Sequence, residues 1–297
     1  MIKSNILVLI GTLLLAACSA TSNHSADAQN TLLAVPRQPG IEQQAAIAKL
    51  TEIINLTDAS EEQRARLYYD RGVRYDSVGM KALAHLDFNR ALHLKPDFAE
   101  AYNFIGIHYT QGEQFVDAFE AFGSAIELDA NHQYAMLNRG IARYYAGRVE
   151  LATEDFSEFY QRSPSDPYRV LWLYISEVET DEIKAQQNLL THREKLNTQD
   201  WSTSIVDLYL GRISEEQFLS LVPYGIESEE AYAERLCEAY FYLGKLLEHN
   251  GEYNAAAKYF KLALATNIYD FVEHRYALLE LKRIALISMK NNEDKSA

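Results

Sequence analysis

Few side chains in this sequence have the types and the spacing that catalysis or metal binding requires. It contains no glycine-rich phosphate loop, no Gly-x-Ser-x-Gly elbow and no His-Glu-x-x-His motif. His85 and His93 share a helix face, for which we expect solvent contact. No two histidines have the spacing of metal ligands on one helix; the eight are His24, His85, His93, His108, His132, His192, His249 and His274. We therefore expect no catalytic residues, no metal site and no enzymatic activity.

The sequences around the two cysteines predict different roles for them. Cys18 follows Leu15-Ala16-Ala17, after a basic residue and an apolar stretch shorter than the roughly 20 residues that span a bilayer. Cys237 lies on an apolar helical stretch without a neighbouring cation, so we expect a buried, unreactive thiol.

The residues before Cys18 resemble the bacterial lipobox, in which a leucine precedes two small residues and the cysteine. The alternative is an ordinary secretory signal with a cysteine there by chance. The resemblance implies that residues 1–17 are a cleaved signal peptide and that Cys18 carries diacylglycerol on its thiol and an acyl chain on its amine. Three acyl chains anchor a protein durably, whereas one chain does so only marginally. No other cofactor is expected.

The residues after Cys18 predict where the protein is anchored and how it is tethered. In enterobacterial-type lipoproteins, Asp at the next position signals inner-membrane retention, but Ser19 stands here. The resemblance therefore implies a lipid anchor in the outer membrane, with the protein facing the periplasm. Small and polar residues dominate the start of the segment 18–40, which predicts a flexible tether.

The composition excludes several classes of protein. The chain has 297 residues, with 28 Lys and Arg against 42 Asp and Glu, which gives a formal net charge of −14. Its basic residues are not clustered, which argues against nucleic-acid binding. Two cysteines are too few for a disulfide scaffold or a four-cysteine zinc site. The 20 tyrosines, against 2 tryptophans, exceed what average composition predicts.

A 34-residue period runs through the chain, and residues of the same kind recur in columns at this spacing. The columns are Gly72, Gly106 and Gly140; Ala84, Ala118 and Ala152; Phe88, Phe122 and Phe156; Tyr75 and Tyr109; and Pro96 with Pro164 two periods later. The glycine and a large residue four positions before it share one face of a first helix. The alanine and phenylalanine form one stripe on a second helix. The pattern predicts antiparallel helix pairs that approach closely at the glycine.

These columns resemble the tetratricopeptide repeat, an α-helical family whose helix pairs stack into a solenoid. We expect an all-α solenoid over residues 41–290, with a tail at 291–297 that is disordered. The registers that fit the repeat are 65–98, 99–132, 133–166 and 237–270.

The segments outside the clear repeats are also expected to be helical. Residues 167–236 have room for two divergent helix pairs, with Trp172 and Ser176 at the large and small positions. A helix at 41–56 precedes the array, and a final helix begins near Asp270. Three residue pairs predict capping boxes at helix starts: Ser60 with Gln63, Asp97 with Glu100, and Ser214 with Gln217.

The repeat resemblance also predicts a binding surface. In this fold the first helix of each pair lines a concave groove suited to segments of partner proteins. The family's clamp for two carboxylates needs Lys, Arg and Asn together, but Arg66, Asn103 and Lys245 lie too far apart in the array. We therefore expect extended or helical protein segments as ligands. The expected groove residues are Tyr69, Val73, Asn103, Ile107, Leu137, Ile141, Tyr144, Phe241 and Lys245. The alternative is that about half of them are buried by the curvature of the array itself.

A more specific resemblance covers nearly the whole chain. The lipobox, the segment 33–39, three repeats, a divergent middle and a late fourth repeat occur together in the NlpI family of enterobacterial lipoproteins. The segments 138–142, 171–174 and above all 271–281 are similar to that family at matching positions.

This resemblance implies a non-enzymatic adaptor that forms homodimers. Such proteins bind the periplasmic processing protease Prc and present the peptidoglycan endopeptidase MepS for degradation. They also serve as scaffolds for other cell-wall hydrolases and are linked to cell division. The helix at 41–56, outside the repeat register, is the expected dimer contact. The alternatives are a subunit of an outer-membrane or pilus assembly machine, and a cell-wall hydrolase.

Overall fold

The computed structural model describes residues 31–56 and 58–296 of the chain. The chain divides into two units, residues 1–33 and 34–297, and the fold given below is that of the second unit. The expected signal peptide and Cys18 lie outside the described residues, as does the tether up to residue 30. In the described part, none of the helices combines the length and the apolar character that crossing a bilayer requires.

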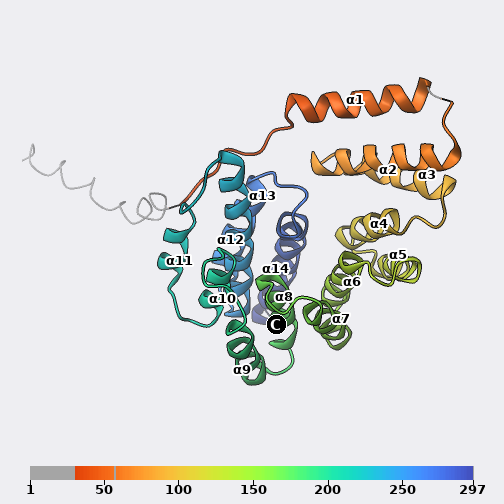
Figure 1. The fold of residues 1–297 in the computed structure, drawn as a ribbon. Helices are drawn as coiled ribbons and strands as arrows, with labels where there is room; N and C mark the ends of the chain where they lie inside the picture. The colour runs from red at the N-terminus through yellow and green to blue at the C-terminus, as the bar shows by residue number, and fades with distance from the viewer. Residues whose placement is uncertain (1–30, 57, 297) are drawn as a thin grey trace, which may run out of the picture. The chain divides into compact units, whose positions relative to one another are not determined.

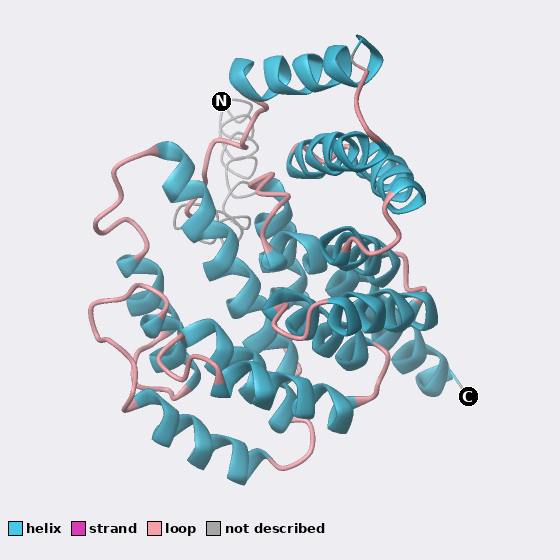
Figure 2. Cartoon of the chain, turned by 45° about the vertical axis from the view of Figure 1, so that its right-hand side comes forward, coloured by secondary structure: helices cyan, strands magenta, loops and turns pink. Residues whose placement is uncertain are grey.

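The second unit is built from α-helices (Figure 1). Figure 2 shows these helices joined by loops, and no strand occurs among the described residues. This is the all-α class that the repeat columns predict. The helices are α1 (Ile41–Leu56), α2 (Glu61–Ser77), α3 (Lys81–Leu94), α4 (Ala99–Gln111), α5 (Phe115–Leu128), α6 (Gln133–Tyr145), α7 (Val149–Gln161), α8 (Pro167–Glu177), α9 (Glu182–Arg193), α10 (Thr203–Tyr209), α11 (Glu215–Leu221), α12 (Glu229–His249), α13 (Tyr253–Ala265) and α14 (Val272–Ser296).

The glycine and phenylalanine columns form the contacts between paired helices. Gly106 of α4 faces Phe122 of α5 so closely that a Cβ atom at residue 106 would lie 2.6 Å from the ring. The same contact recurs between α2 and α3, between α6 and α7, and between α12 and α13. The core of the array therefore lies between paired helices, where the four phenylalanines are fully buried: Phe88, Phe122, Phe156 and Phe260.

A buried ion pair joins the two helices of the first and third pairs. Arg71 of α2 donates to both carboxylate oxygens of Asp87 in α3, at 2.6 and 2.8 Å. Two periods later, Arg139 of α6 makes the same bidentate contact with Asp155 of α7, at 3.1 and 2.7 Å. Because a buried carboxylate without a partner is costly, these pairs fix the orientation of each second helix on its first.

The divergent middle forms one helix pair, α8 and α9, two residues out of the 34-residue register, and then departs from the pattern. Trp172 and Ser176 of α8 are both buried. The Trp172 ring lies between Phe156 of α7 and Phe241 of α12, at centroid distances of 5.5 and 6.2 Å. Thus α12 lies beside α8, although the three helices α9 to α11 separate them along the chain. The two short helices α10 and α11 do not repeat the glycine contact.

The helix starts confirm two of the three expected capping boxes. Ser60 and Gln63 cap α2 reciprocally, as do Ser214 and Gln217 at α11. The expected box of Asp97 with Glu100 is wrong, because α4 begins at Ala99 and its N-cap, Phe98, has no side-chain hydrogen bond. Asp97 therefore lies one residue too early to cap the helix.

Helix α14 is longer than the helix expected there. It runs from Val272 to Ser296, through the segment expected to be a tail. It packs against α13, α12 and α4. Figure 1 shows α12 and α14 between the repeats that contain α4 to α7 and the short helices α10 and α11, with α8 beside α14.

Candidate functional site

The first helices of the repeats present a face to α14, and this concave face is where the expected groove residues belong. Only Tyr69 and Val73 are half-buried. The other seven are buried: Asn103, Ile107, Leu137, Ile141, Tyr144, Phe241 and Lys245. The structure does not bring the nine together into one open surface, since most of them pack inside the array.

Packing between successive repeats explains this burial. Ile107 of α4 packs against Phe122 of the same repeat and Ala142 of the next. The amide of Asn138 in α6 donates to the side-chain oxygen of Asn103 in α4, at 3.0 Å. Tyr69 packs against Phe98 at a centroid distance of 4.7 Å, and its burial raises its pKa to about 12. These side chains of the first helices thus hold successive repeats together.

Helix α14 lies along the concave face and is anchored to it by polar contacts. Arg275 donates to Asp76 of α2 at 2.7 Å, although 199 residues separate them. Gln111 of α4 donates to the carbonyl oxygen of Arg275 at 3.3 Å. Farther along, Lys282 donates to Glu113, after α4, at 2.6 Å. The chain's own helix therefore covers part of the surface where a partner segment was expected.

A chain of polar groups continues from the Arg275 anchor to the surface. His108 Nε2 lies 2.8 Å from Oδ1 of Asp76, and His108 Nδ1 lies 3.3 Å from Nδ1 of His85. Burial raises the pKa of Asp76, but the hydrogen bonds from His108 and Arg275 outweigh it, so the net pKa lies below its usual value. Asp76 is therefore ionised and fixed between two donors. His85, expected on a solvated face, is half-buried against His108.

A second anchor surrounds the buried Lys245 of α12. Its Nζ lies 2.8 Å from Glu280 of α14 and 3.0 Å from Glu248, and it donates to the Tyr144 hydroxyl at 3.0 Å. Tyr145 of α6 donates to Glu280 at 2.8 Å. Burial lowers the pKa of Lys245, but the adjacent Glu280 outweighs that effect, so the pKa lies well above its usual value. These charges link the third repeat, the fourth repeat and α14.

A cavity of about 230 Å³ lies beside this anchor. Its walls carry phenol rings and charged groups from six helices, together with a few apolar side chains. Arg283 of α14 lines it, with its guanidinium carbon 5.1 Å from the centre of the Tyr144 ring. The remaining polar lining residues are Tyr174, Glu179, Tyr209, Lys245, Glu248, His249 and Tyr253. The cavity has room for one or two side chains of a partner.

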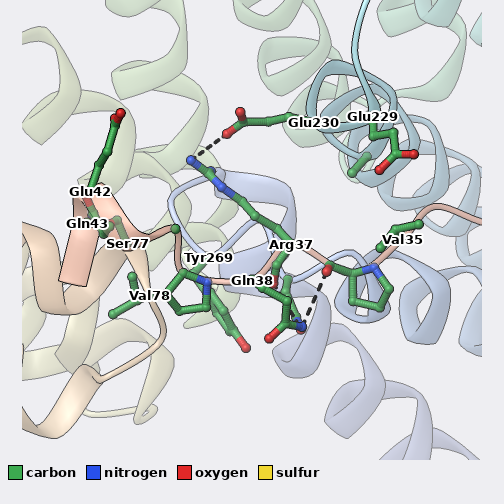
Figure 3. A pocket seen from close by; sticks show the side chains of 15 residues that line it. Val35, Arg37, Gln38, Glu42, Gln43, Ser77, Val78, Glu229, Glu230 and Tyr269 are labelled. Atoms are coloured by element: carbon green, nitrogen blue, oxygen red, sulfur yellow. Dashed lines mark hydrogen bonds and ion pairs between the residues drawn. The ribbon is translucent and has the colours of Figure 1, made fainter. Parts of the chain in front are cut away.

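A larger cavity, of about 540 Å³, lies beneath the extended segment 35–40 (Figure 3). The backbone N–H of Arg37 donates to the carbonyl oxygen of Thr266 at 2.9 Å, and its guanidinium lies 2.7 Å from Glu230. Figure 3 shows Arg37 reaching Glu230 across the cavity, with Glu42 and Gln43 of α1 on the opposite side. This segment thus connects α1 with the last repeat.

Sequence reasoning missed the residues that hold α14 in place. Neither Glu280 nor Arg283 falls in a repeat column, and both belong to the Lys245 anchor. The available signal was a single glutamate inside the apolar run 277–281, which indicates a buried and paired carboxylate. Cys237 is fully buried, as expected, and burial raises the pKa of its thiol. In the described part of the chain, no three His, Cys, Asp or Glu side chains are placed to hold a metal ion.

Comparison with known proteins finds one repeat family and several similar solved structures. A family model described as tetratricopeptide repeat matches residues 111–167 and 237–270. The structure is similar to YrrB, a TPR protein with an unusual peptide-binding site, at 15% identity over 77% of this chain and 96% of that chain, with a TM-score of 0.43.

Two further solved structures are similar over most of the chain. PilF of Pseudomonas aeruginosa is 18% identical over 74% of this chain and 99% of its own, with a TM-score of 0.44. A tetratricopeptide repeat protein from Parabacteroides merdae is 16% identical over 83% of this chain and 100% of its own, with a TM-score of 0.48. The family match and the glycine–phenylalanine contacts show that this chain carries tetratricopeptide repeats in an all-helical, solenoid-like fold.

Proposed function

We propose that this protein is a lipid-anchored periplasmic adaptor of the NlpI type and is not an enzyme. One observation carries the proposal: the sequence Leu15-Ala16-Ala17-Cys18 stands in front of an array of tetratricopeptide repeats. Such arrays present side chains on extended surfaces suited to binding other proteins. A triacylated Cys18 would hold the array at the outer membrane, facing the periplasm.

The proposed partners are the processing protease Prc and the endopeptidase MepS, with other cell-wall hydrolases as further clients. Support comes from the segments that resemble the NlpI family, above all residues 271–281. That segment includes the buried Glu280 of the Lys245 anchor and the half-buried Arg275, which contacts Asp76. An adaptor of this kind accelerates degradation because two partners on one scaffold meet at high effective concentration.

A degradation assay with purified Prc and MepS tests the proposal. The full chain at equimolar concentration should shorten the half-life of MepS at least tenfold, because tethering replaces a bimolecular encounter. An unchanged half-life would overturn the adaptor function. Release of muropeptides by the chain alone would identify an enzyme. Recovery of pilus or barrel-assembly components from an envelope extract, with neither protease nor hydrolase, would identify an assembly subunit.

We also propose that the adaptor is a homodimer that pairs through α1. Helix α1 packs on α2, and Gln43 of α1 contacts both Ser77 and Arg74 of that helix. Its first and last residues remain largely exposed, Ile41 at 86% and Leu56 at 75%. Sedimentation velocity should show a dimer for the full chain and a monomer after Ile41→Asp with Leu56→Asp. A dimer that survives both substitutions would exclude these contacts.

A further inference from the structure

Helix α14 has no second helix packed on one of its sides. On the corresponding side, α2, α4, α6 and α12 each pack against the helix that follows them. Adding one period of 34 to Gly244 places Leu278 of α14 in the glycine column. In α2, α4, α6 and α12 the residue in this column is glycine, and the phenylalanine of the following helix lies against it. Leu278 has no such cover, and 53% of its surface is exposed.

Helix α14 also continues where the other first helices end. Helices α2, α4, α6 and α12 end at Ser77, Gln111, Tyr145 and His249, each five residues after the glycine column. The same register would end α14 near residue 283, but the helix runs on to Ser296. It therefore extends farther past the glycine column than any of these four helices does.

This open face is a continuous stripe on α14. Its members recur at helical spacing and lie within about 100° around the helix axis. We name Leu278, Ala285, Leu286 and Met289 the α14 stripe; all four are exposed, Leu286 at 62% and Met289 at 64%. The opposite side of the helix is buried and includes Tyr276, Glu280 and Ile284. Single exposed apolar residues are ordinary, but a terminal helix of a repeat array is expected to be polar on its outer face.

The charge around the stripe differs from that of the rest of the protein. The exposed charged side chains of α13 and of α14 as far as Lys290 are all basic, in a chain of net charge −14; after Lys290 the sequence of α14 adds Glu293, Asp294 and Lys295. Both glutamates of α14 in this range, Glu273 and Glu280, are buried. Lys258, Lys261 and Lys290 form no ion pair with the described side chains. Lys290 follows Met289 of the stripe directly, and Lys258 and Lys261 lie on α13, which packs against α14. An apolar stripe with lysines on its own helix and on the neighbouring helix is complementary to a helix with an apolar face and acidic flanks.

We propose that the α14 stripe is a docking site for an acidic amphipathic helix of a partner protein, which packs on α14 as the missing second helix of a fifth pair. Leu278 is larger than glycine, so the partner must place a small residue opposite it. Its acidic flanks lie beside Lys258, Lys261 and Lys290. This inference rests on the proposed adaptor function, since it identifies a surface by which such a protein holds a client.

The chain itself supplies a probe with this chemistry. Residues 114–129, which contain α5, include four acids and alternate phenylalanine with alanine on the apolar face. In the structure α5 is the second helix that covers Gly106. A hydrocarbon-stapled, fluorescent peptide of this sequence can be titrated with the full chain and followed by anisotropy. The control peptide replaces its four acids with lysine.

The full chain should bind the acidic peptide saturably and the lysine peptide at least tenfold more weakly. Leu286→Asp with Met289→Asp should raise the dissociation constant at least tenfold. Both residues are mostly exposed, so circular dichroism should show an intact fold. Ile183→Asp, at an apolar residue of α9 that is 74% exposed, is the matched control and should leave binding unchanged. Lys258→Glu with Lys261→Glu should weaken binding and reduce its salt dependence.

Absence of saturable binding, or equal binding by the doubly substituted stripe variant, would overturn the proposal. Co-sedimentation with phosphatidylglycerol vesicles that the stripe substitutions abolish, without peptide binding, would show that the stripe contacts a membrane instead. A self-association that the same substitutions abolish would assign it to a second copy. If the stripe variant still accelerates MepS degradation, the adaptor function stands and only this surface is wrongly assigned.

Discussion

At the scale of single residues, the glycine column shows how one missing atom decides whether two helices can pair. Gly106 and Gly123 lie in α4 and α5, and only the first faces a neighbouring side chain. A Cβ atom at Gly106 would lie 2.6 Å from the Phe122 ring, whereas nothing lies within 4 Å of a Cβ atom at Gly123. The two positions therefore separate the effect of close packing from the general effect of glycine in a helix.

We predict that Gly106→Ala lowers the free energy of unfolding by about 1–3 kcal/mol, because the methyl group forces Phe122 from its site. Gly123→Ala should raise it by about 0.5–1 kcal/mol, because alanine loses less backbone freedom on folding. Urea denaturation followed by circular dichroism measures both. Equal effects of the two substitutions would mean that the glycine column does not set the helix spacing.

Glu238 gives a residue-scale prediction of pH dependence. Trp201 Nε1 donates to its carboxylate at 3.0 Å, and burial together with the nearby Glu273 raises the pKa of Glu238 to about 8. Between the ordinary value near 4.5 and 8, the folded state holds a proton that the unfolded state has lost. The free energy of unfolding should therefore fall as pH rises through this range, by at most about 1.4 kcal/mol per unit.

Glu238→Gln keeps an acceptor for Trp201 and removes the titration. The variant should be more stable than the parent chain at pH 8.5 and lose that advantage toward pH 5. Thermal denaturation at several pH values measures the difference. A constant difference across this range would show that Glu238 does not titrate with a raised pKa.

At the scale of helices, the Lys245 anchor determines how firmly α14 is attached. Lys245→Met should lower the free energy of unfolding by about 3–5 kcal/mol, because Glu280 then remains buried without its closest cation. Lys282→Ala also removes an ion pair of α14, with Glu113, but both side chains are nearly half-exposed. Its cost should be below about 1 kcal/mol. Similar losses in the two variants would show that burial of the pair does not matter.

The helices also show what the sequence reveals and what it conceals. The period of 34 predicts the four helix pairs, and Ser60 and Ser214 predict two helix starts, because both signals are local. The position of α14 depends on contacts such as Arg275 with Asp76, which lie 199 residues apart and follow no period. For the same reason the sequence did not reveal that seven of the nine expected groove residues are buried. Packing between repeats and the presence of α14 became visible only in three dimensions.

At the scale of the whole second unit, α14 changes the way the array should unfold. Repeat arrays usually behave as chains of neighbours, in which each repeat is stabilised only by those beside it. Here α14 connects the first repeat through Asp76, the third through Tyr145 and the fourth through Lys245. The repeats should therefore lose their structure together, and α2 should be protected as strongly as α12.

Hydrogen exchange of the full chain and of Arg275→Gln tests this coupling. The substitution removes the contact with Asp76 and leaves the Lys245 anchor intact, so the last turn of α2 should exchange faster while α12 and α13 keep their protection. Lys282→Ala serves as the control, since its exposed ion pair with Glu113 contributes little. Unchanged exchange at residues 72–77 in Arg275→Gln would mean that α14 rests on the first repeat without stabilising it, and that the array behaves as a chain of neighbours after all.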